Sequence, residues 1–403
     1  MNMLKARDAI KENTIKVTSI TYVKNCAEYI EKCLRSIMDQ TLQQIEILVC
    51  DGGSSDGTLE IIERLMKTDD RIRLFRTEGS VGLQFNTALR EARGEYTAIC
   101  EGDDYILPDK YEYLYRLMVE NNLDVCRSGC YAVVEKGDIE FRYRMGDSVP
   151  SKMFDRIMYR DDNPMLFLRT GVNLFFSGMY RTKFLIDNGI RMNETKGASY
   201  QDIGFSFLAQ YYAERYCFTE KVLHCYRIDN LNASFFYKDY EDRCKTEYAL
   251  LKENLIKRGL FEECKIIFDE WYGRSIEWGK HQRLVDTNPL FGFFKNEYLP
   301  KMKIAVVGMG PGYKQLVDYL RHLRANAVYS GINPLYAIIQ FGVKDVVSLP
   351  EIVKNEVDKV IAFPSSFTDG TLEKLSQSGI GKDKILLFDE PYFFLRYIFA
   401  AAN

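Results

Sequence analysis

Short apolar runs rich in β-branched residues alternate with segments of helical periodicity along the first hundred residues. The runs predict strands at Ile15–Thr21, Ile45–Asp51, Arg71–Arg76 and Tyr96–Cys100. Between them, apolar residues spaced three and four apart predict helices over 27–38, from Thr58 onward and over Val81–Ala92. Strands that alternate with helices form parallel sheets that helices cover on both faces. The pattern therefore predicts an α/β domain with a mostly parallel sheet.

The pattern becomes less regular between about residues 123 and 235. Strand candidates occur at Val125–Val134, Ile139–Arg144, Tyr216–Phe218 and Val222–Arg227. Helices are expected near 152–160 and over 200–213. We interpret this part as an antiparallel extension that completes the sheet, with long loops able to hold a substrate.

The rest of the chain divides into a helical part and a second α/β series. Residues 238–283 keep apolar positions at helical spacing, and 287–300 contains two prolines and a glycine. Strands are predicted at Lys303–Val307, Val357–Phe363 and Ile385–Phe388, with helices over Tyr313–Leu323 and 370–377. We therefore predict three parts: an α/β domain at 1–237, a helical linker region at 238–300, and a small Rossmann-like domain at 301–403.

Composition narrows the class of protein. The 403 residues include 54 Lys and Arg against 57 Asp and Glu, a net charge of −3. Proteins that bind nucleic acid electrostatically are usually basic, so nucleic acid is set aside as the partner. The sequence contains no run of about 18 apolar residues, so no transmembrane helix is predicted. The ten cysteines show no CxxC pair or zinc spacing, which favours free thiols in a reducing cytoplasm. Peripheral attachment to the inner face of a membrane stays open.

Polar residues follow three of the predicted parallel strands at the point where each strand ends. They are Thr21, Tyr22 and Asn25 after the first, the stretch DGGSSD at 51–56 after the second, and EGDD at 101–104 after the fourth. Ligands bind beyond the carboxyl ends of the strands in an open parallel sheet, so we expect these loops to converge. Acids rather than lysines at this edge favour a divalent metal that bridges the site to a phosphate.

Purely structural explanations also exist for these residues. Asp51 with its glycines is compatible with a simple turn, and Asp56 with a helix cap. Asp103 and Asp104, ahead of Pro108, are compatible with capping the next helix. Each motif alone is weak, whereas their shared order and spacing favour a site.

In that order and spacing the chain resembles the catalytic core of the family 2 glycosyltransferases, which have the GT-A fold. The matching stretches are VTSITYVKN at 17–25, QTLQQIEILVCDGGSSDGT at 40–58, NTALREARGEYTAICEGDDYILP at 86–108 and SYQDIGF at 199–205. The resemblance covers roughly residues 15–235.

The resemblance implies a role for each matched residue. Asp51 would accept a hydrogen bond from the donor base, most often uracil, and Thr21 would line the same pocket. Asp103 would ligate Mn²⁺ or Mg²⁺ on the donor diphosphate, and Glu101, where Asp is usual, would face the ribose or the sugar. The other residues expected to bind the donor are Tyr22, Asn25, Gly53, Ser54 and Asp104.

Three residues later in the chain complete the implied site. Asp202 matches the family's catalytic base, although it is also compatible with capping the helix that follows. His224 is either a third metal ligand, a contact to the diphosphate or a buried strand histidine. Arg227 is expected to contact the diphosphate or the acceptor, because guanidinium pairs bidentately with phosphate.

The function implied is an inverting, metal-dependent transfer of a hexosyl or N-acetylhexosaminyl group. The donor would be a nucleoside diphosphate sugar, UDP-linked, and the acceptor a hydroxyl of a glycan or lipid-linked molecule in bacterial surface polysaccharide synthesis. The alternatives are a nucleotidyltransferase acting on sugar phosphates and an inactive scaffold. TYVKNCAEY lacks the glycine-rich basic loop of the first, and the intact acids argue against the second.

The turn GMGPGY at 308–313 resembles a dinucleotide-binding fingerprint but has Tyr313 in place of the last glycine. We therefore expect the last domain to serve oligomerisation or partner docking rather than to bind NAD.

Overall fold

The computed structural model describes residues 14–136, 139–145, 149–163, 165–170, 175–230, 232–233, 239–283, 304–307, 336–339, 359–362, 377 and 379–387. These residues form two compact units. The first comprises 1–132, 144–227 and 232–277, and the second comprises 133–143, 228–231 and 278–403. The predicted boundaries at 237/238 and 300/301 stay predictions.

The first four strands of the first unit run parallel, and they lie next to one another at one end of its strand order. Their order is β3 (Ile72–Arg76), β2 (Ile45–Asp51), β1 (Val17–Val23) and β4 (Tyr96–Ile99). Every residue of β1 and β2 is buried, which is consistent with their mainly apolar and β-branched sequences. Tyr22 lies beside Cys50, and Val23 beside Asp51, so the ends of these two strands meet at one edge.

Helices cover both faces of these strands, and successive side chains of each strand point to opposite faces. Ile20 and Leu48 pack with Phe85 of α4 (Val81–Glu91) in one apolar core. Ile47 and Val49 belong to the other core, which contains the buried residues of three helices. These helices are α2 (Ile30–Met38), α3 (Thr58–Met66) and α5 (Lys110–Asn121). The predicted α/β architecture with parallel strands is confirmed.

An antiparallel extension follows β4, as predicted. The strand order continues through β9 (Gly178–Arg181), β6 (Val125–Lys136), β10 (Arg215–Arg227) and β5 (Tyr105–Ile106). Two further strands, β7 (Ile139–Arg144) and β8 (Ile157–Tyr159), pair with β6 and β10. Short connecting elements are the 3₁₀ turns η1 (Ser151–Met153), η2 (Arg160–Asp162) and η3 (Phe175–Ser177) and the helices α6 (Leu166–Thr170) and α7 (Thr182–Asp187).

Two local predictions are wrong. The helix expected near 152–160 is a 3₁₀ turn followed by β8, because Ile157–Tyr159 pairs with the start of β10. The two strands expected at 216–218 and 222–227 form the single strand β10, since Thr219–Lys221 continue the extended chain between them.

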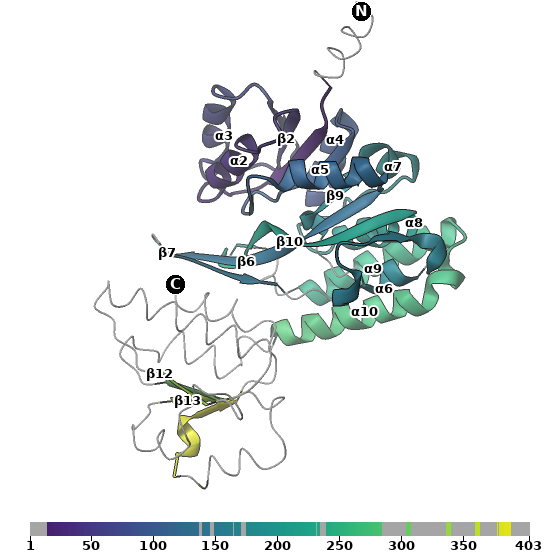
Figure 1. Cartoon of the computed structure of the whole chain (residues 1–403). Coiled ribbons are helices and arrows are strands. Elements are labelled where there is room, and N and C mark those ends of the chain that lie inside the picture. The colour runs from purple at the N-terminus through teal and green to yellow at the C-terminus, as the bar shows by residue number, and fades with distance from the viewer. Residues whose placement is uncertain are drawn as a thin grey trace, which may run out of the picture. The chain divides into compact units, whose positions relative to one another are not determined.

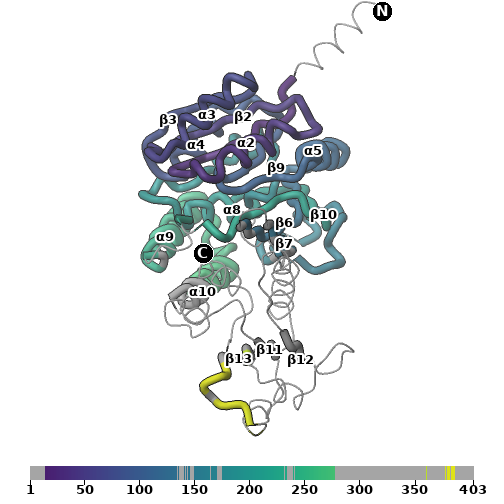
Figure 2. Tube along the Cα trace, turned by 90° about the vertical axis from the view of Figure 1, so that its left-hand side faces the viewer, coloured from purple at the N-terminus to yellow at the C-terminus, as the bar shows by residue number. Residues whose placement is uncertain are grey.

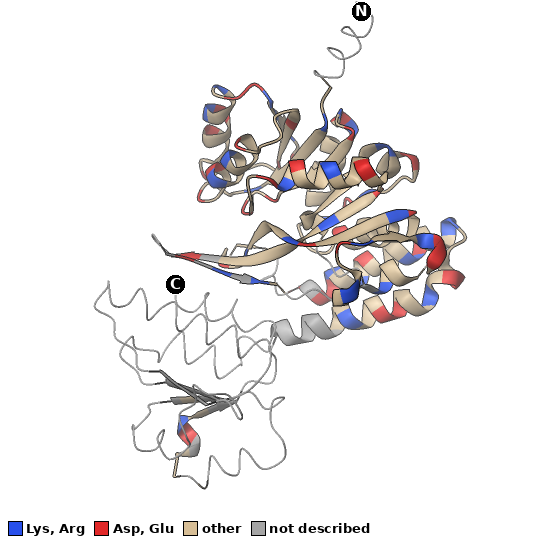
Figure 3. Cartoon of the chain, viewed as in Figure 1, with Lys and Arg blue, Asp and Glu red and all other residues tan. Residues whose placement is uncertain are grey.

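Two helices and most of a third complete the first unit, and they lie close together (Figures 1 and 2). They are α8 (Asp202–Tyr212), α9 (Tyr240–Lys257) and α10 (Phe261–Arg283). Tyr248 and Trp271 pack in the same apolar core as Phe85. The Trp271 indole nitrogen donates a hydrogen bond to the carbonyl oxygen of Leu168 at 2.8 Å. Figure 3 shows positive and negative residues interspersed along α9 and α10. No helix within the described residues has the length and apolar character needed to cross a bilayer.

The second unit contains a four-stranded sheet in the order β12, β11, β13, β14. The strands are β11 (Ile304–Val307), β12 (Tyr336–Ile339), β13 (Lys359–Ala362) and β14 (Ile385–Leu387), which the turn η7 (Lys382–Lys384) precedes. All three pairings are parallel. The GMGPGY turn, the helix over 313–323 and the linker at 287–300 lie outside the described residues. The Rossmann-like assignment therefore stays a prediction.

Candidate active site

The loops after β1 and β2 are joined by side chain to backbone hydrogen bonds. The backbone amide of Asn25 donates to the hydroxyl oxygen of Ser54 at 2.9 Å, and the amide of Ser55 donates to the Asn25 side-chain oxygen at 2.9 Å. Asn25 has a φ of 53°, a left-handed conformation that asparagine tolerates better than most residues. The predicted convergence of these two loops is therefore present.

Asp51 ends β2 with a buried carboxylate that organises the following turn. It accepts hydrogen bonds from the amide of Gly53 at 2.9 Å and from the amide of Ser54 at 3.1 Å. Gly53 has a φ of 89°, which favours glycine. This arrangement satisfies the turn interpretation of Asp51, and its contact with a donor base stays a prediction.

Thr21 lies near the end of β1 and is fully buried. Within the described part of the chain its hydroxyl oxygen has no hydrogen-bond partner. Buried polar atoms are normally paired, so such a group needs an explanation, such as a bound molecule that supplies the partner.

Tyr22 gathers several acids around its phenol. The hydroxyl donates a hydrogen bond to the carboxylate of Glu101. Burial raises the pKa of Tyr22 well above its usual value, and the negative charges of Glu101, Asp202 and Asp104 raise this pKa further. Acids from the loop after β4 and from the start of α8 therefore act on one side chain at the end of β1.

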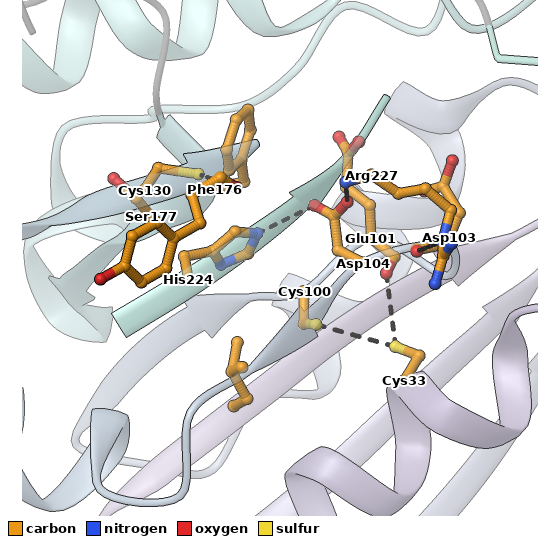
Figure 4. Close-up of polar contacts among 12 residues, drawn as sticks. Cys33, Cys100, Glu101, Asp103, Asp104, Cys130, Phe176, Ser177, His224 and Arg227 are labelled. Atoms are coloured by element: carbon orange, nitrogen blue, oxygen red, sulfur yellow. Dashed lines mark hydrogen bonds and ion pairs between the residues drawn. The ribbon is translucent and has the colours of Figure 1, made fainter. Parts of the chain in front are cut away.

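Asp104 is buried and fixed by two neighbours, which Figure 4 shows on either side of its carboxylate. One oxygen accepts a hydrogen bond from the backbone amide of Arg227 at 2.9 Å. The other lies 2.9 Å from Nε2 of His224. The opposite ring nitrogen, Nδ1 of His224, lies 2.8 Å from the amine of Lys110. Asp104, His224 and Lys110 thus form a continuous buried polar chain, which we call the Asp–His–Lys chain.

Burial is the main cause of the pKa shifts in the Asp–His–Lys chain. It raises the pKa of Asp104, lowers that of His224 and lowers that of Lys110 to about 8, because it penalises the charged form of each group. The strand-histidine alternative predicts such a buried, paired ring. The metal-ligand role of His224 and the donor-binding role of Asp104 stay predictions.

Arg227 connects β10 to the loop after β4. Its Nε donates a hydrogen bond to the carbonyl oxygen of Asp103 at 2.9 Å, and its guanidinium lies 4.7 Å from the ring centroid of Tyr29. The side chain is therefore held beside Asp103, on the side where a phosphate is expected.

A metal ion held by the protein alone is not supported within the described residues, because they contain no group of three suitable His, Cys, Asp or Glu ligands. In nucleotide sites, Mg²⁺ is commonly bound by one or two carboxylates together with substrate phosphates. The partly buried Asp103, two residues from Glu101, fits that second arrangement.

Asp202 is the first residue of α8, and Gln201 is at the N-cap position. Its side chain is partly exposed. Burial raises the pKa of its carboxyl group to about 6, and the negative charge of Glu247 adds to this rise. A carboxylate with this pKa is ionised at neutral pH and remains a useful proton acceptor.

Sequence reasoning missed two buried charged residues of this region, Lys110 and Glu247. Their positions in the sequence of α5 and α9 are equally compatible with the exposed face of a helix. Each residue is nevertheless 1% exposed or less. Their partners are at least 50 residues away in the chain, so no local signal identifies them.

Residues 18–188 match the family model described as Glycosyl transferase family 2. Among curated relatives, Glycosyltransferase GlyA of Streptococcus pneumoniae is 35% identical over 144 residues, which cover 35% of this chain and 20% of that protein. Chondroitin synthase of Pasteurella multocida is 33% identical over 25% of this chain and 11% of its own length. The chain thus spans only a small part of these relatives.

Solved structures that resemble the chain include Staphylococcus aureus TarS 1–349 in complex with UDP. It is 22% identical, has a TM-score of 0.47, and the match covers 70% of this chain and 76% of that one. The mannosyltransferase PcManGT of Pyrobaculum calidifontis, in complex with GDP-Man and Mn²⁺, is 14% identical with a TM-score of 0.41, over 79% and 83% of the two chains.

Proposed function

We propose, because residues 18–188 match the family model described as Glycosyl transferase family 2, that the chain is an inverting, metal-dependent glycosyltransferase. It would transfer a hexosyl or N-acetylhexosaminyl group from a UDP-linked sugar to a hydroxyl of a glycan or lipid-linked acceptor. One observation carries the proposal: the phenol of Tyr22, at the carboxyl edge of the parallel strands, donates a hydrogen bond to the carboxylate of Glu101, in the same loop as Asp103.

The donor base would bind at the ends of β1 and β2. Thr21, which is buried near the end of β1, would line this base pocket. Asp51 would accept a hydrogen bond from the base while it holds the turn with Gly53 and Ser54. Tyr22 and Asn25 would complete the donor contacts from the β1 loop.

The donor diphosphate would lie beside Asp103. Asp103, together with Glu101, would hold Mn²⁺ or Mg²⁺ with the phosphate oxygens, and the metal when bound would offset charge on the departing nucleoside diphosphate. Arg227 would place its positive charge next to the same phosphates. His224 would act through Asp104 by keeping the loop after β4 in place.

The transfer step would use Asp202 as the general base. The acceptor hydroxyl oxygen forms a bond to the anomeric carbon, and the bond from that carbon to the diphosphate oxygen breaks. The hydroxyl proton moves to the Asp202 carboxylate. Attack from the side opposite the leaving group inverts the configuration, and no enzyme nucleophile is needed.

A polysaccharide context is supported by the names of relatives. These include chondroitin synthase and hyaluronan synthase of Pasteurella multocida. We propose a bacterial surface glycan as the class of product. The similarity to these relatives covers only 25% of this chain, so their own products are not carried over to it.

Two variants test the proposal. UDP binding would be titrated with and without Mn²⁺, and a panel of UDP-sugars would be screened for hydrolysis and transfer. Asp202→Asn should lower turnover by about 10²–10⁴-fold and leave UDP affinity nearly unchanged, because it removes only the base. Asp103→Ala should remove the Mn²⁺ dependence of UDP binding. Full turnover in Asp202→Asn would refute the base assignment. Cleavage of nucleoside triphosphates would favour the nucleotidyltransferase, and absence of UDP binding would favour the scaffold.

The pH dependence gives an independent prediction. The reactive form of Asp202 is the carboxylate, and its pKa is raised to about 6, so the reactive fraction falls as the pH drops through 6. We expect kcat/KM to be level above this pH and to fall about tenfold per pH unit below it. A profile that stays level down to pH 4 would contradict an essential Asp202 with this pKa.

A further inference from the structure

The segment 192–201, which leads directly into Asp202, has no helix or strand of its own. On one side α4 holds it. The side-chain nitrogen of Asn86 donates to the carbonyl oxygen of Met192 at 2.8 Å, and the Met192 amide donates to the Asn86 side-chain oxygen at 3.1 Å. The amide of Val81 also donates to the carbonyl oxygen of Gly197 at 3.2 Å. The segment therefore depends on packed helices for its shape.

Glu247 of α9 holds the other side of this segment. Its carboxylate is 1% exposed and accepts a hydrogen bond from the Asn193 side-chain nitrogen at 2.7 Å and another from the Thr195 hydroxyl. The Asn193 amide donates to the carbonyl oxygen of Gln201 at 3.3 Å, and the Gln201 side-chain nitrogen donates to that of Thr195 at 3.2 Å. Asn193 and Thr195 thus connect Glu247 to Gln201, the residue that directly precedes Asp202.

The charge of Glu247 also acts on Asp202. Both hydrogen-bond partners of Glu247 are neutral, so they do not cancel the negative charge that it carries when ionised, and burial raises the pKa of Glu247 itself. This charge raises the pKa of Asp202, in addition to burial. Among the described residues, the phenols of Tyr22 on β1, Tyr180 on β9 and Tyr248 on α9 also interact with the charge of Asp202, and burial raises the pKa of each phenol further above neutrality.

We propose that Glu247 is a positioning residue for Asp202, which it orients by fixing the segment 192–201 through Asn193 and Thr195. The catalytic consequence rests on the proposed function, whereas the positioning itself does not. Glu247 lies 59 positions beyond the end of the matched family region at residue 188, so α9 would be part of the catalytic unit.

Three variants of the full chain separate the geometric and electrostatic roles. Glu247→Ala removes both hydrogen bonds and the charge. Glu247→Gln removes only the charge, because its carbonyl can accept from Asn193 and its amide can donate to the hydroxyl of Thr195. Glu253→Gln is the matched control, since Glu253 is an exposed acid on the same helix, paired with Lys257.

Hydrogen exchange of the unliganded chain measures the positioning without any activity assay. Glu247→Ala should raise the exchange rate of amides within 192–201 by about tenfold or more, because local opening becomes easier. Glu247→Gln and Glu253→Gln should leave these rates unchanged. Unchanged exchange in a folded Glu247→Ala variant would overturn the proposal.

Kinetics give the second readout, with UDP release measured from the UDP-sugar that the panel selects. Glu247→Ala should lower kcat by about 10–100-fold at unchanged UDP affinity, since a small displacement of a catalytic group has effects of this size. Glu247→Gln should move the acidic limb of kcat/KM to lower pH, because loss of a nearby negative charge lowers the pKa of Asp202. The limb should not move in Glu253→Gln.

The outcomes distinguish the two proposals. If Asp202→Asn keeps full turnover, the proposed function fails, and the exchange data alone decide whether Glu247 fixes the segment. If Asp202→Asn is inactive while Glu247→Ala changes neither exchange nor kcat, the positioning role is wrong. If Glu247→Ala does not fold, hydrogen exchange in Thr195→Val decides, because this variant removes one of the two hydrogen bonds to Glu247, and unchanged exchange within 192–201 overturns the proposal.

Discussion

Gly82, on the first turn of α4, allows a backbone contact that a larger residue would block. A Cβ atom at this position would lie 1.8 Å from the carbonyl oxygen of Asn193. The obstacle is backbone rather than the end of a flexible side chain, so it cannot simply rotate away. The glycine is therefore required by the close approach of the segment 192–201 to α4.

Gly82→Ala should destabilise the protein by about 1–3 kcal/mol, because the methyl group overpacks a buried contact. It should also lower turnover, since the segment that carries Asp202 must shift. The matched control is Gly273→Ala in α10, where a Cβ atom would meet nothing within 4 Å. There the change should stabilise the helix by about 0.5–1 kcal/mol. Urea denaturation of both variants measures the two signs, and equal effects would contradict the steric explanation.

At the scale of elements, the Asp–His–Lys chain joins the loop after β4, strand β10 and helix α5. Lys110 also donates to the carbonyl oxygen of Phe176 at 3.2 Å, which brings in the 3₁₀ turn η3. Buried charged groups are costly unless their partners satisfy them. The Asp–His–Lys chain therefore fixes the relative positions of these elements, and with them the position of the loop that carries Asp103.

His224→Leu should lower the free energy of unfolding by about 3 kcal/mol or more, because it leaves Asp104 and Lys110 buried without their shared partner. The double variant Lys110→Met with His224→Leu should lose less than the sum of the two single losses, as expected for residues in contact. Lys221→Met is the control. Lys221 lies on β10, as His224 does, and forms an exposed ion pair with Asp109. Loss of this ion pair should lower the free energy of unfolding by under about 1 kcal/mol. If urea denaturation shows that the two single losses of unfolding free energy simply add in the double variant, Lys110 and His224 are not coupled.

At the scale of the whole molecule, α9 and the part of α10 up to Glu277 fall within the first compact unit. They contribute buried residues to the core that also contains Phe85 and Ile99. These are Tyr248, Leu251, Leu255, Ile267, Phe268 and Trp271. Burial of each such side chain contributes about 1.5–3 kcal/mol, so six together match the net stability of a typical domain.

A fragment of residues 1–237 should therefore fail to fold, although 237 is the predicted end of the first domain. A fragment of residues 1–283 keeps α9 and α10 and should unfold cooperatively and bind UDP. Circular dichroism during heating, followed by UDP titration, compares the two fragments. A stable, UDP-binding 1–237 fragment would show that the helices are dispensable.

The sequence alone determined the parallel strands and their helices. Residues 45–51 read as a strand because both faces of that strand are buried, which favours a mainly apolar run such as ILVC at 47–50. The polar residues after β1 and β2 were placed correctly at one edge for a similar reason, since parallel strands end on the same side. Both inferences depend on patterns that are local in the chain.

Tertiary structure alone decided the supports of the site. Strands β5, β8 and β9 have two to four residues each, so their periodicity is too short to read, and only pairing with distant strands makes them strands. The buried positions of Lys110 and Glu247 likewise follow from partners that are far apart in sequence. A charge has no local pattern that reveals whether it will be buried, because burial depends on which elements fold over it.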